Sequence, residues 1–330
     1  MNRTKLDEAV KPQRPKVEIR QPTLFQMEKL DQAAELAGEL KIERPYPLPG
    51  ILLGTSAFTA NGWEGSFYPP GMKSPDFLSY YATQFPTVEV DSTFYGTPSA
   101  ATVEKWYKKT PPDFIFAAKV PQSITHEKVL VGCDDEMGNF LKTMDALGEK
   151  LGPLLFQFPY FDRAKFKSGG EFIAHLREFL KTLPTGYRFA VEVRNKSWMD
   201  ARLAQSLREH RVALVLMDRA WMPRPKELFE KFDPITADFT YIRWLGDRKG
   251  IEERTKTWDR AIVDRREELR EWAEVCERIV KRRIQIFAFA NNHYAGHAPA
   301  TVEMFRDIWR SKTREDLGSR QAPMTGSLFD

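Results

Sequence analysis

The stretch TVEVDSTFY, residues 87–95, begins like a buried β-strand and ends in charged and hydroxyl side chains. Val88 and Val90 alternate with Glu89 and Asp91, so one face of the strand is apolar and the other carries two carboxylates. The outward side chains of a barrel strand pack against helices, which assigns the valines to the outside and the carboxylates to the interior. The stretch therefore predicts a barrel strand with charge at its carboxyl end.

Seven further β-like runs alternate along the chain with segments of helical periodicity. These runs lie at residues 51–58, 114–121, 151–159, 188–195, 212–218, 239–246 and 284–292. The helical segments lie at residues 74–85, 99–110, 134–150, 171–183, 200–209, 225–232, 264–281 and 299–312. Strand and helix repeated eight times predict a TIM (β/α)8 barrel. A doubly wound open sheet is the alternative, but no glycine-rich phosphate turn follows the first strand.

The barrel pattern does not occupy the whole chain. Residues 1–45 are rich in charge and proline and predict an N-terminal extension, an arm followed by one amphipathic helix over residues 27–40. The barrel itself is expected over residues 46–312. Residues 313–330 are expected to form a flexible C-terminal tail.

Composition points to a soluble cytoplasmic protein. The 330 residues include 50 basic and 46 acidic side chains, and this net charge of +4 permits an anionic ligand without demanding nucleic acid. The two cysteines are far apart, which suggests neither a disulfide framework nor a Cys-x-x-Cys metal site. The first residues have no apolar core for a signal peptide, and no apolar run is long enough for a membrane span. We expect no cofactor.

Polar side chains occupy inward positions near the carboxyl ends of four further strands. The same alternation places inside the barrel the residues Lys119, Gln157, Glu192, Arg194 and Arg243. Barrel enzymes build their active sites at this end, so the charges predict the floor of a pocket. An internal ion-pair network without a ligand is the alternative, although buried ion pairs stabilise proteins poorly.

Three histidines follow strands, namely His126, His293 and His297. His293 and His297 are four residues apart, but Gly296 predicts a loop between them and so disfavours a zinc site on a helix. The segment containing Asn291 and Asn292, with the first turn of the following helix, instead predicts a phosphate-binding corner. Cations would compete with a metal ion for the carboxylates, and we therefore expect no metal.

Aromatic residues also gather after the strands. Those expected to contact substrate are Trp63, Tyr95 and Trp198. Aromatic rings at a pocket mouth can stack on bases or sugars, and the alternative is ordinary packing within loops.

Several blocks resemble the YecE-like family, catalogued as domain of unknown function 72. The resemblance covers roughly residues 50–310 and is carried by GTSAFTANGWEGSFYPPG, VEVDSTFYGTPSA, KVPQSITHEKVL, VEVRNKSW and ANNHYAGHAPAT. It implies a TIM barrel and supplies no reaction. Barrels of this kind are distantly similar to endonuclease-IV-like and xylose-isomerase-like barrels, which hints at nucleic-acid or sugar substrates. Those enzymes use a multi-metal cluster, whereas this chain places lysine and arginine among its carboxylates.

The first functional hypothesis is an enzyme acting on a phosphate-bearing or nucleic-acid-derived substrate. Its anion would bind to Lys119, Arg194 and Arg243, with Glu89, Asp91 or Glu192 as general acid or base and with His126 or His293 assisting. The alternative is a non-catalytic protein that binds single-stranded nucleic acid, its basic N-terminal arm following the phosphates. The final Ser327-Leu328-Phe329 weakly resembles the tails that dock on sliding clamps.

Overall fold

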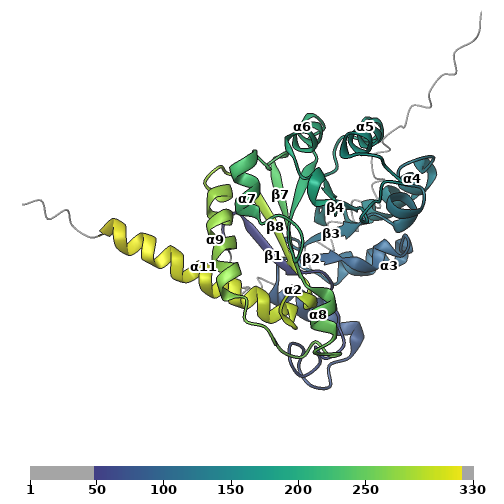
Figure 1. Cartoon of the computed structure of the whole chain (residues 1–330). Coiled ribbons are helices and arrows are strands. Elements are labelled where there is room, and N and C mark those ends of the chain that lie inside the picture. The colour runs from purple at the N-terminus through teal and green to yellow at the C-terminus, as the bar shows by residue number, and fades with distance from the viewer. Residues whose placement is uncertain (1–47, 322–330) are drawn as a thin grey trace, which may run out of the picture. The chain divides into compact units, whose positions relative to one another are not determined.

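Eight parallel strands form the centre of the computed structural model, which describes residues 48–321 and their side chains up to Thr313 (Figure 1). The strands are β1 (Ile51–Thr55), β2 (Thr87–Val90), β3 (Ile115–Lys119), β4 (Leu151–Gln157), β5 (Phe189–Glu192), β6 (Ala213–Arg219), β7 (Phe239–Gly246) and β8 (Gln285–Ala290). Seven lie within a predicted run, and β6 extends one residue past its run, so all eight predicted strands are confirmed. The predicted N-terminal arm and helix, and the clamp-like tail sequence, lie outside the described residues.

The strand order is β1-β8-β7-β6-β5-β4-β3-β2, with every neighbouring pair parallel. This is the order of a TIM-like barrel that is nearly closed between β1 and β2. At this seam the Tyr81 hydroxyl accepts a hydrogen bond from the Thr55 N–H at 2.9 Å and donates one to the Thr87 carbonyl at 3.1 Å. A Cβ on Gly54 would lie 2.0 Å from the Thr87 oxygen, so the two strands approach closely only because residue 54 is glycine.

Helices surround the strands (Figure 1). Those in the described part of the chain are α2 (Phe77–Gln84), α3 (Ala100–Lys108), α4 (Asp134–Met144), α5 (Gly169–Leu180), α6 (Ala201–Glu209), α7 (Pro225–Lys231), α8 (Arg248–Glu252), α9 (Arg266–Val280), α10 (Asn292–Ala295) and α11 (Ala298–Gln321). Every predicted helical segment overlaps one of them, although α5 and α11 begin before their predicted starts. Ser99 caps α3 as an N-cap serine should, accepting the Thr102 N–H. The last helix runs to Gln321, past its predicted end at Lys312.

The predicted phase of the strands is confirmed by two separate apolar clusters. The outer cluster, between strands and helices, contains Val88, Val90, Val191 and Trp244. The inner cluster fills the barrel with Ala117, Leu155, Ala190, Ala213, Val215, Phe239, Tyr241, Phe287 and Phe289. One further inward step along β3, β4, β5 and β7 reaches a polar residue on each strand: Lys119, Gln157, Glu192 and Arg243. The apolar filling therefore ends where the polar layer begins.

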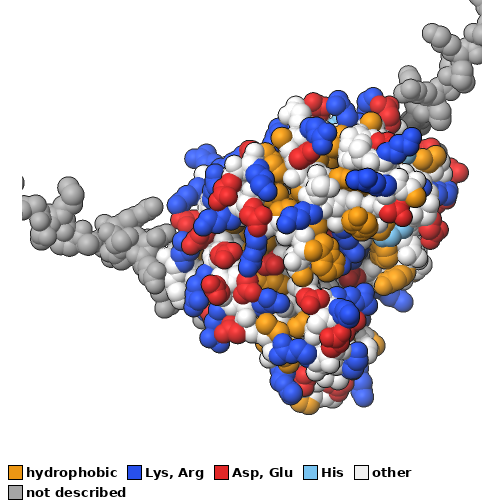
Figure 2. All heavy atoms as spheres, viewed as in Figure 1, with side chains coloured by type: hydrophobic (Ala, Val, Ile, Leu, Met, Phe, Trp, Pro, Cys, Tyr) orange, Lys and Arg blue, Asp and Glu red, His pale blue; other side chains and the backbone are white. Residues whose placement is uncertain are grey.

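The surface over α9 is charged without being predominantly basic. Figure 2 shows Lys and Arg interspersed with Asp and Glu there. Lys281 pairs with Glu277 at 2.5 Å, and Arg282 pairs with Asp233 at 2.8 Å. Among the described residues, no helix is long and apolar enough to cross a membrane.

Candidate functional site at the carboxyl end of the barrel

The floor of the site is a buried ion triad, in which Arg243 lies between Glu89 and Glu192. Arg243 donates from Nη2 to Glu89 Oε1 at 2.6 Å and from Nη1 to Glu192 Oε2 at 2.5 Å. Tyr241 donates its hydroxyl to Glu89 Oε2 at 2.6 Å, and Arg194 Nε donates to Glu192 Oε1 at 3.1 Å. All four carboxylate oxygens are thus hydrogen-bonded. The two glutamates are completely buried.

The environments of the two glutamates push their pKa values apart. Burial raises the pKa of Glu89, and repulsion from Asp91 adds to this, although Arg243 acts in the opposite direction. Burial also opposes ionisation of Glu192, but attraction to Arg243 and Arg194 outweighs it and brings the pKa of Glu192 down to about 2. Glu192 is therefore a fixed negative charge at neutral pH, whereas Glu89 is the more easily protonated of the pair.

A second, more accessible layer lies above the triad. Lys119 Nζ is 2.8 Å from Asp91 Oδ1, and the same oxygen is 3.7 Å from Arg243 Nη2. The side chain of Asp91 is 33% exposed and that of Arg194 is 23% exposed, in contrast to the buried glutamates. Because reacting groups must touch the substrate, Asp91 is better placed for acid–base work than Glu89 or Glu192.

Arg219, at the end of β6, belongs to the same cluster and was missed in the sequence. Burial, together with repulsion from Arg194, lowers the pKa of Arg219 to about 10. Within the described residues its guanidinium pairs with no carboxylate. It lies over the Trp221 ring at 4.4 Å from the centroid. The sequence did contain a signal for Arg219. Residues 212–219, VALVLMDR, are an apolar run that ends in charged residues, like the strands that carry the other charges.

With Arg219 included, the charges at this end of the barrel no longer cancel. The charge cluster consists of the cations Lys119, Arg194, Arg219 and Arg243 and the carboxylates Glu89, Asp91 and Glu192. Four cations against three carboxylates leave one positive charge when every group is ionised. Protonation of Glu89 would raise the excess to two. The cluster is therefore electrostatically suited to an anion.

His126 lies near Arg194 and Lys119 of the charge cluster. It belongs to a single turn of π-helix, Ser123–Glu127, which follows β3. Such turns are rare and occur frequently at functional sites. Burial lowers the pKa of His126 to about 4, with repulsion from Arg194 and Lys119 adding to the effect. Its Nδ1 lies 2.8 Å from the Thr125 hydroxyl. In the described part of the chain, its Nε2 makes no hydrogen bond and is available to a ligand.

Gln157 lies on the wall of the site. It ends β4 beside Glu192, its register partner on β5, and its side chain is almost completely buried. Its amide makes no hydrogen bond to any other described residue. The amide is therefore available to donate or accept a hydrogen bond to a ligand.

His293 is held on both sides by oxygen atoms. Its Nδ1 is 2.6 Å from Asn291 Oδ1, which also accepts the His293 backbone N–H, and its Nε2 is 2.9 Å from Glu252 Oε1. Burial lowers the pKa of His293, against the opposing effect of Glu252. With both ring nitrogens engaged, His293 is less available to a ligand than His126.

The segment between the two late histidines is not the predicted loop. Residues Asn292–Ala295 form one helical turn, α10, which ends at Gly296 in the left-handed region with φ 105°. The prediction missed this turn because four residues are too few for a helical period to show. The expected separation of His293 from His297 still holds, because Gly296 ends the turn before His297. Among the described residues, no group of three or more His, Cys, Asp or Glu side chains could hold a metal ion.

At the predicted phosphate-binding corner, side chains of the protein already accept hydrogen bonds from the backbone N–H groups that a phosphate would need. Asn292 Oδ1 accepts the N–H of Ala298 at 2.9 Å, and His297 Nδ1 accepts the N–H of Ala300 at 3.3 Å. Two donors of the first turn of α11 are thus satisfied internally. The cations of the charge cluster lie instead at or just beyond the ends of β3, β5, β6 and β7.

Two of the three aromatic residues expected to contact substrate lie in the core. Trp63 is buried and donates its indole N–H to Asn292 Oδ1 at 3.2 Å. Trp198 is buried and stacks on Phe172 with ring centroids 4.9 Å apart. Tyr95 is 77% exposed. Alternation and loop position cannot distinguish a ring that packs inward from one that faces solvent.

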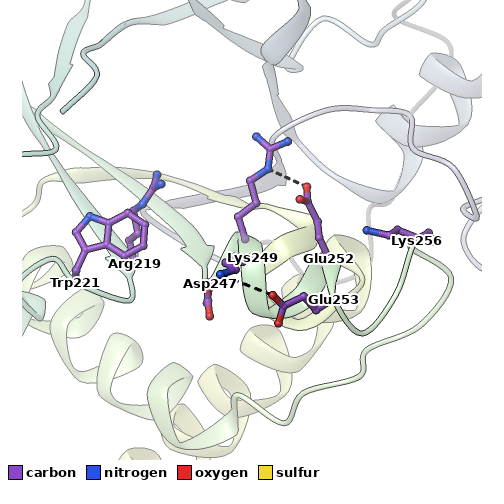
Figure 3. Close-up of a pocket in the computed structure, with 8 residues that line it drawn as sticks. Arg219, Trp221, Asp247, Lys249, Glu252, Glu253 and Lys256 are labelled. Atoms are coloured by element: carbon purple, nitrogen blue, oxygen red, sulfur yellow. Dashed lines mark hydrogen bonds and ion pairs between the residues drawn. The ribbon is translucent and has the colours of Figure 1, made fainter.

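A cavity of about 410 Å³ opens beside the charge cluster, between the segments that follow β6 and β7 (Figure 3). It is lined by Arg219, Trp221, Asp247, Arg248, Lys249, Glu252, Glu253 and Lys256. This volume falls within the usual range for small-molecule sites. Arg219 belongs both to the cavity wall and to the charge cluster, so the two are continuous.

Part of the chain is similar in sequence to curated proteins. Curated relatives include the UPF0759 proteins YunF of Bacillus subtilis and YecE of Escherichia coli K12, 38% and 32% identical over 146 residues. These matches cover 42% and 43% of this chain and 50% and 52% of the relatives, so the chain spans about half the length of the curated relatives it matches.

Solved structures extend the similarity over most of the chain. A DUF72 family protein from Thermotoga maritima has a TM-score of 0.62 and 27% identity, covering 80% of this chain and 99% of that one. A DUF72 family protein from Enterococcus faecalis has a TM-score of 0.59 and 23% identity, covering 79% and 95%, and shows the fold alone. The family model described as "Protein of unknown function DUF72" matches residues 52–325. The chain therefore belongs to the DUF72 family, as its sequence blocks predicted.

Proposed function

We propose that this protein is an enzyme that binds a phosphate-bearing substrate at the carboxyl face of its barrel, above the buried ion triad. The observation that carries the proposal is Arg219, which is half-buried beside Arg194 and Arg243 and pairs with no carboxylate of the described residues. Removing a cation from water costs several kcal/mol unless an opposite charge compensates it. A phosphate group is the ligand that would supply this charge.

The accessible layer provides the reacting and binding groups of this proposal. Lys119, Arg194 and Arg219 hold the anion, and the amide of Gln157 adds a hydrogen bond. Asp91 and His126 act as general acid and base. Glu89 and Glu192 position Arg243 and Arg194 from below.

The low pKa of His126 suits this arrangement. The imidazole is neutral at pH 7 because burial and two nearby cations disfavour its charged form. A bound phosphate would offset the repulsion from Lys119 and Arg194 and so raise the pKa of His126. Substrate binding would therefore bring His126 closer to the range in which a base works well.

Thermal unfolding with and without inorganic phosphate or ribose 5-phosphate tests the proposal. A ligand that binds the folded state at a hundred times its Kd stabilises it by about 2.7 kcal/mol, which raises the midpoint. Arg219→Gln should abolish that rise. The matched control is Arg188→Gln, which also removes a cation lying over a ring, Phe287, but at the start of β5. The proposal is wrong if the ligand raises the unfolding midpoint of both variants equally, or if it does not raise the midpoint of the wild type.

A second candidate function is non-catalytic binding of single-stranded nucleic acid. It is favoured by the positions of Tyr95, Tyr160 and Trp221, the exposed large aromatic side chains of the described residues, which all follow strands at the carboxyl face. Successive bases can stack on such rings. This candidate predicts an oligonucleotide affinity that falls steeply with salt and does not depend on Arg219.

A further inference from the structure

Trp221 has an unusual position for so large an apolar side chain. It follows β6, lines the cavity of about 410 Å³ and remains 50% exposed. Arg219 covers part of the ring at 4.4 Å from its centroid. A guanidinium can lie over only one face of an indole, so ring surface is left for a second planar group.

The opposite side of the cavity carries polar groups of both signs. Figure 3 shows Trp221 and Arg219 together on one side, with Asp247, Lys249 and Glu253 on the other. Lys249 Nζ lies 4.0 Å from Glu253 Oε1, and both side chains are mostly exposed. Their ion pair is therefore weak, and both groups can bind a ligand. A planar ligand stacked on Trp221 would find donors and acceptors for its edge across the cavity. Exocyclic amino groups, carbonyls and ring nitrogens of a nucleobase require such partners.

Arg219 connects this cavity with the anion-binding layer. It touches Trp221 on one side and lies close enough to Arg194 and Arg243 for their charges to lower its pKa. A ligand that spans both places must therefore join a planar aromatic group to an anion through a short polar link. A base, a ribose and a phosphate have this order.

Resting on the proposed function, we infer that the cavity between the segments after β6 and β7 is a nucleobase subsite, and that the phosphate-bearing substrate is a nucleotide. The base stacks on Trp221, opposite Arg219. The phosphate lies in the charge cluster, on Arg219, Arg194 and Lys119. A free nucleotide and the phosphorylated end of a strand share this chemistry.

Calorimetric titration with AMP and with ribose 5-phosphate isolates the base, because AMP carries adenine where ribose 5-phosphate carries its anomeric hydroxyl. AMP should bind the wild-type protein at least tenfold more tightly, as expected for one stacked base. Trp221→Ala should remove this difference and leave the affinity for ribose 5-phosphate unchanged. Trp221→Phe, which keeps an aromatic face, should retain most of it.

The matched control is Tyr160→Ala, which removes an aromatic side chain of similar exposure from the segment after β4, outside the cavity lining. It should leave the AMP affinity within about twofold of the wild type, since it removes no stack. If AMP and ribose 5-phosphate bind equally, or if Tyr160→Ala lowers the AMP affinity as much as Trp221→Ala, the base subsite is wrong while the anion site stands. If neither ligand binds, both proposals fail.

A third experiment distinguishes a free nucleotide from the phosphorylated end of a strand. A 5′-phosphorylated adenine oligonucleotide should compete with AMP and depend on Trp221 in either case. Tighter binding than AMP identifies a strand end as the ligand, and weaker binding identifies the free nucleotide. An oligonucleotide whose affinity is unaffected by Trp221→Ala and that does not displace AMP binds elsewhere, which would contradict a strand end in this subsite.

Discussion

Arg243 on β7 donates to Glu192 on β5, past the intervening strand β6, at 2.5 Å, and both side chains are almost completely removed from solvent. The same guanidinium donates to Glu89 on β2. Three strands that are distant in the sequence are thus tied together at one point. Such pairs add little net stability when compared with apolar replacements, but removing one partner leaves an uncompensated buried charge.

Arg243→Met should therefore destabilise the protein strongly. The variant leaves two buried glutamates without their shared cation, a change that costs about 3–5 kcal/mol in other buried pairs. Urea unfolding at pH 7 measures the loss. Arg282→Met is the control, because it breaks a largely exposed pair with Asp233 and should cost at most about 1 kcal/mol. Equal costs for the two variants would show that the buried triad is unimportant for stability.

Ionised Glu192 should make the unfolding free energy fall as the pH is lowered into the acid range. Its pKa in the folded protein is about 2, below the ordinary value of 4.5, so its contribution is complete above pH 4.5 and is lost as the pH falls toward 2. The shift corresponds to about 3 kcal/mol. The difference in unfolding free energy between the wild type and Glu192→Gln should therefore shrink from about pH 5 to about pH 3. Parallel curves for the two proteins over this range would contradict the assignment.

Glu89→Gln and Glu192→Gln should differ in severity at pH 7. Both oxygens of Glu192 accept from arginine donors, so the amide nitrogen of a glutamine there must face a donor in either orientation. At position 89 one partner is the Tyr241 hydroxyl, which can turn and accept from the amide. Burial also raises the pKa of Glu89, which makes a neutral side chain less costly there. Unfolding free energies should show Glu89→Gln as the milder change by about 1 kcal/mol or more.

Tyr81→Phe should weaken the seam of the barrel. It removes the hydroxyl that joins the Thr55 N–H to the Thr87 carbonyl and leaves both groups buried without that partner, at a cost of about 1–3 kcal/mol. Amide hydrogen exchange should show faster exchange at Thr55 and along β2. Tyr80→Phe is the control, since the neighbouring hydroxyl on the same helix makes no hydrogen bond to the described residues. If the two variants unfold alike, the seam does not depend on Tyr81.

Most of the fold could be predicted because its evidence is local. Strand alternation, as in Val88 and Val90 against Glu89, reports which face of each strand is buried, and the two apolar clusters follow that alternation. The polar inward residues at strand ends likewise predicted Lys119, Glu192 and Arg243 as neighbours. Parallel strands bring their carboxyl ends together, so a pattern repeated on each strand becomes one site.

The partners within that site could not be predicted, since pairing depends on contacts between distant segments. Arg243 lies 154 residues from Glu89 and 51 from Glu192 in the sequence, and no local pattern selects these two carboxylates from the others. The same reason applies to Arg219, which is notable because none of the described carboxylates pairs with its guanidinium. The self-capped first turn of α11 and the inward packing of Trp63 also depend on which segments meet.

The sequence by itself determined the eight strands, the side of each strand that carries charge and the end of the barrel where that charge gathers, because alternation is a property of neighbouring residues. Only the tertiary structure decided which charges neutralise one another. It buried Glu89 and Glu192 beneath Arg243 and left Asp91, His126 and Arg219 nearer to solvent. It also placed Trp221 beside the one arginine of the charge cluster that pairs with no carboxylate among the described residues. Desolvation and ion pairing depend on distance in space, which the order of residues does not fix.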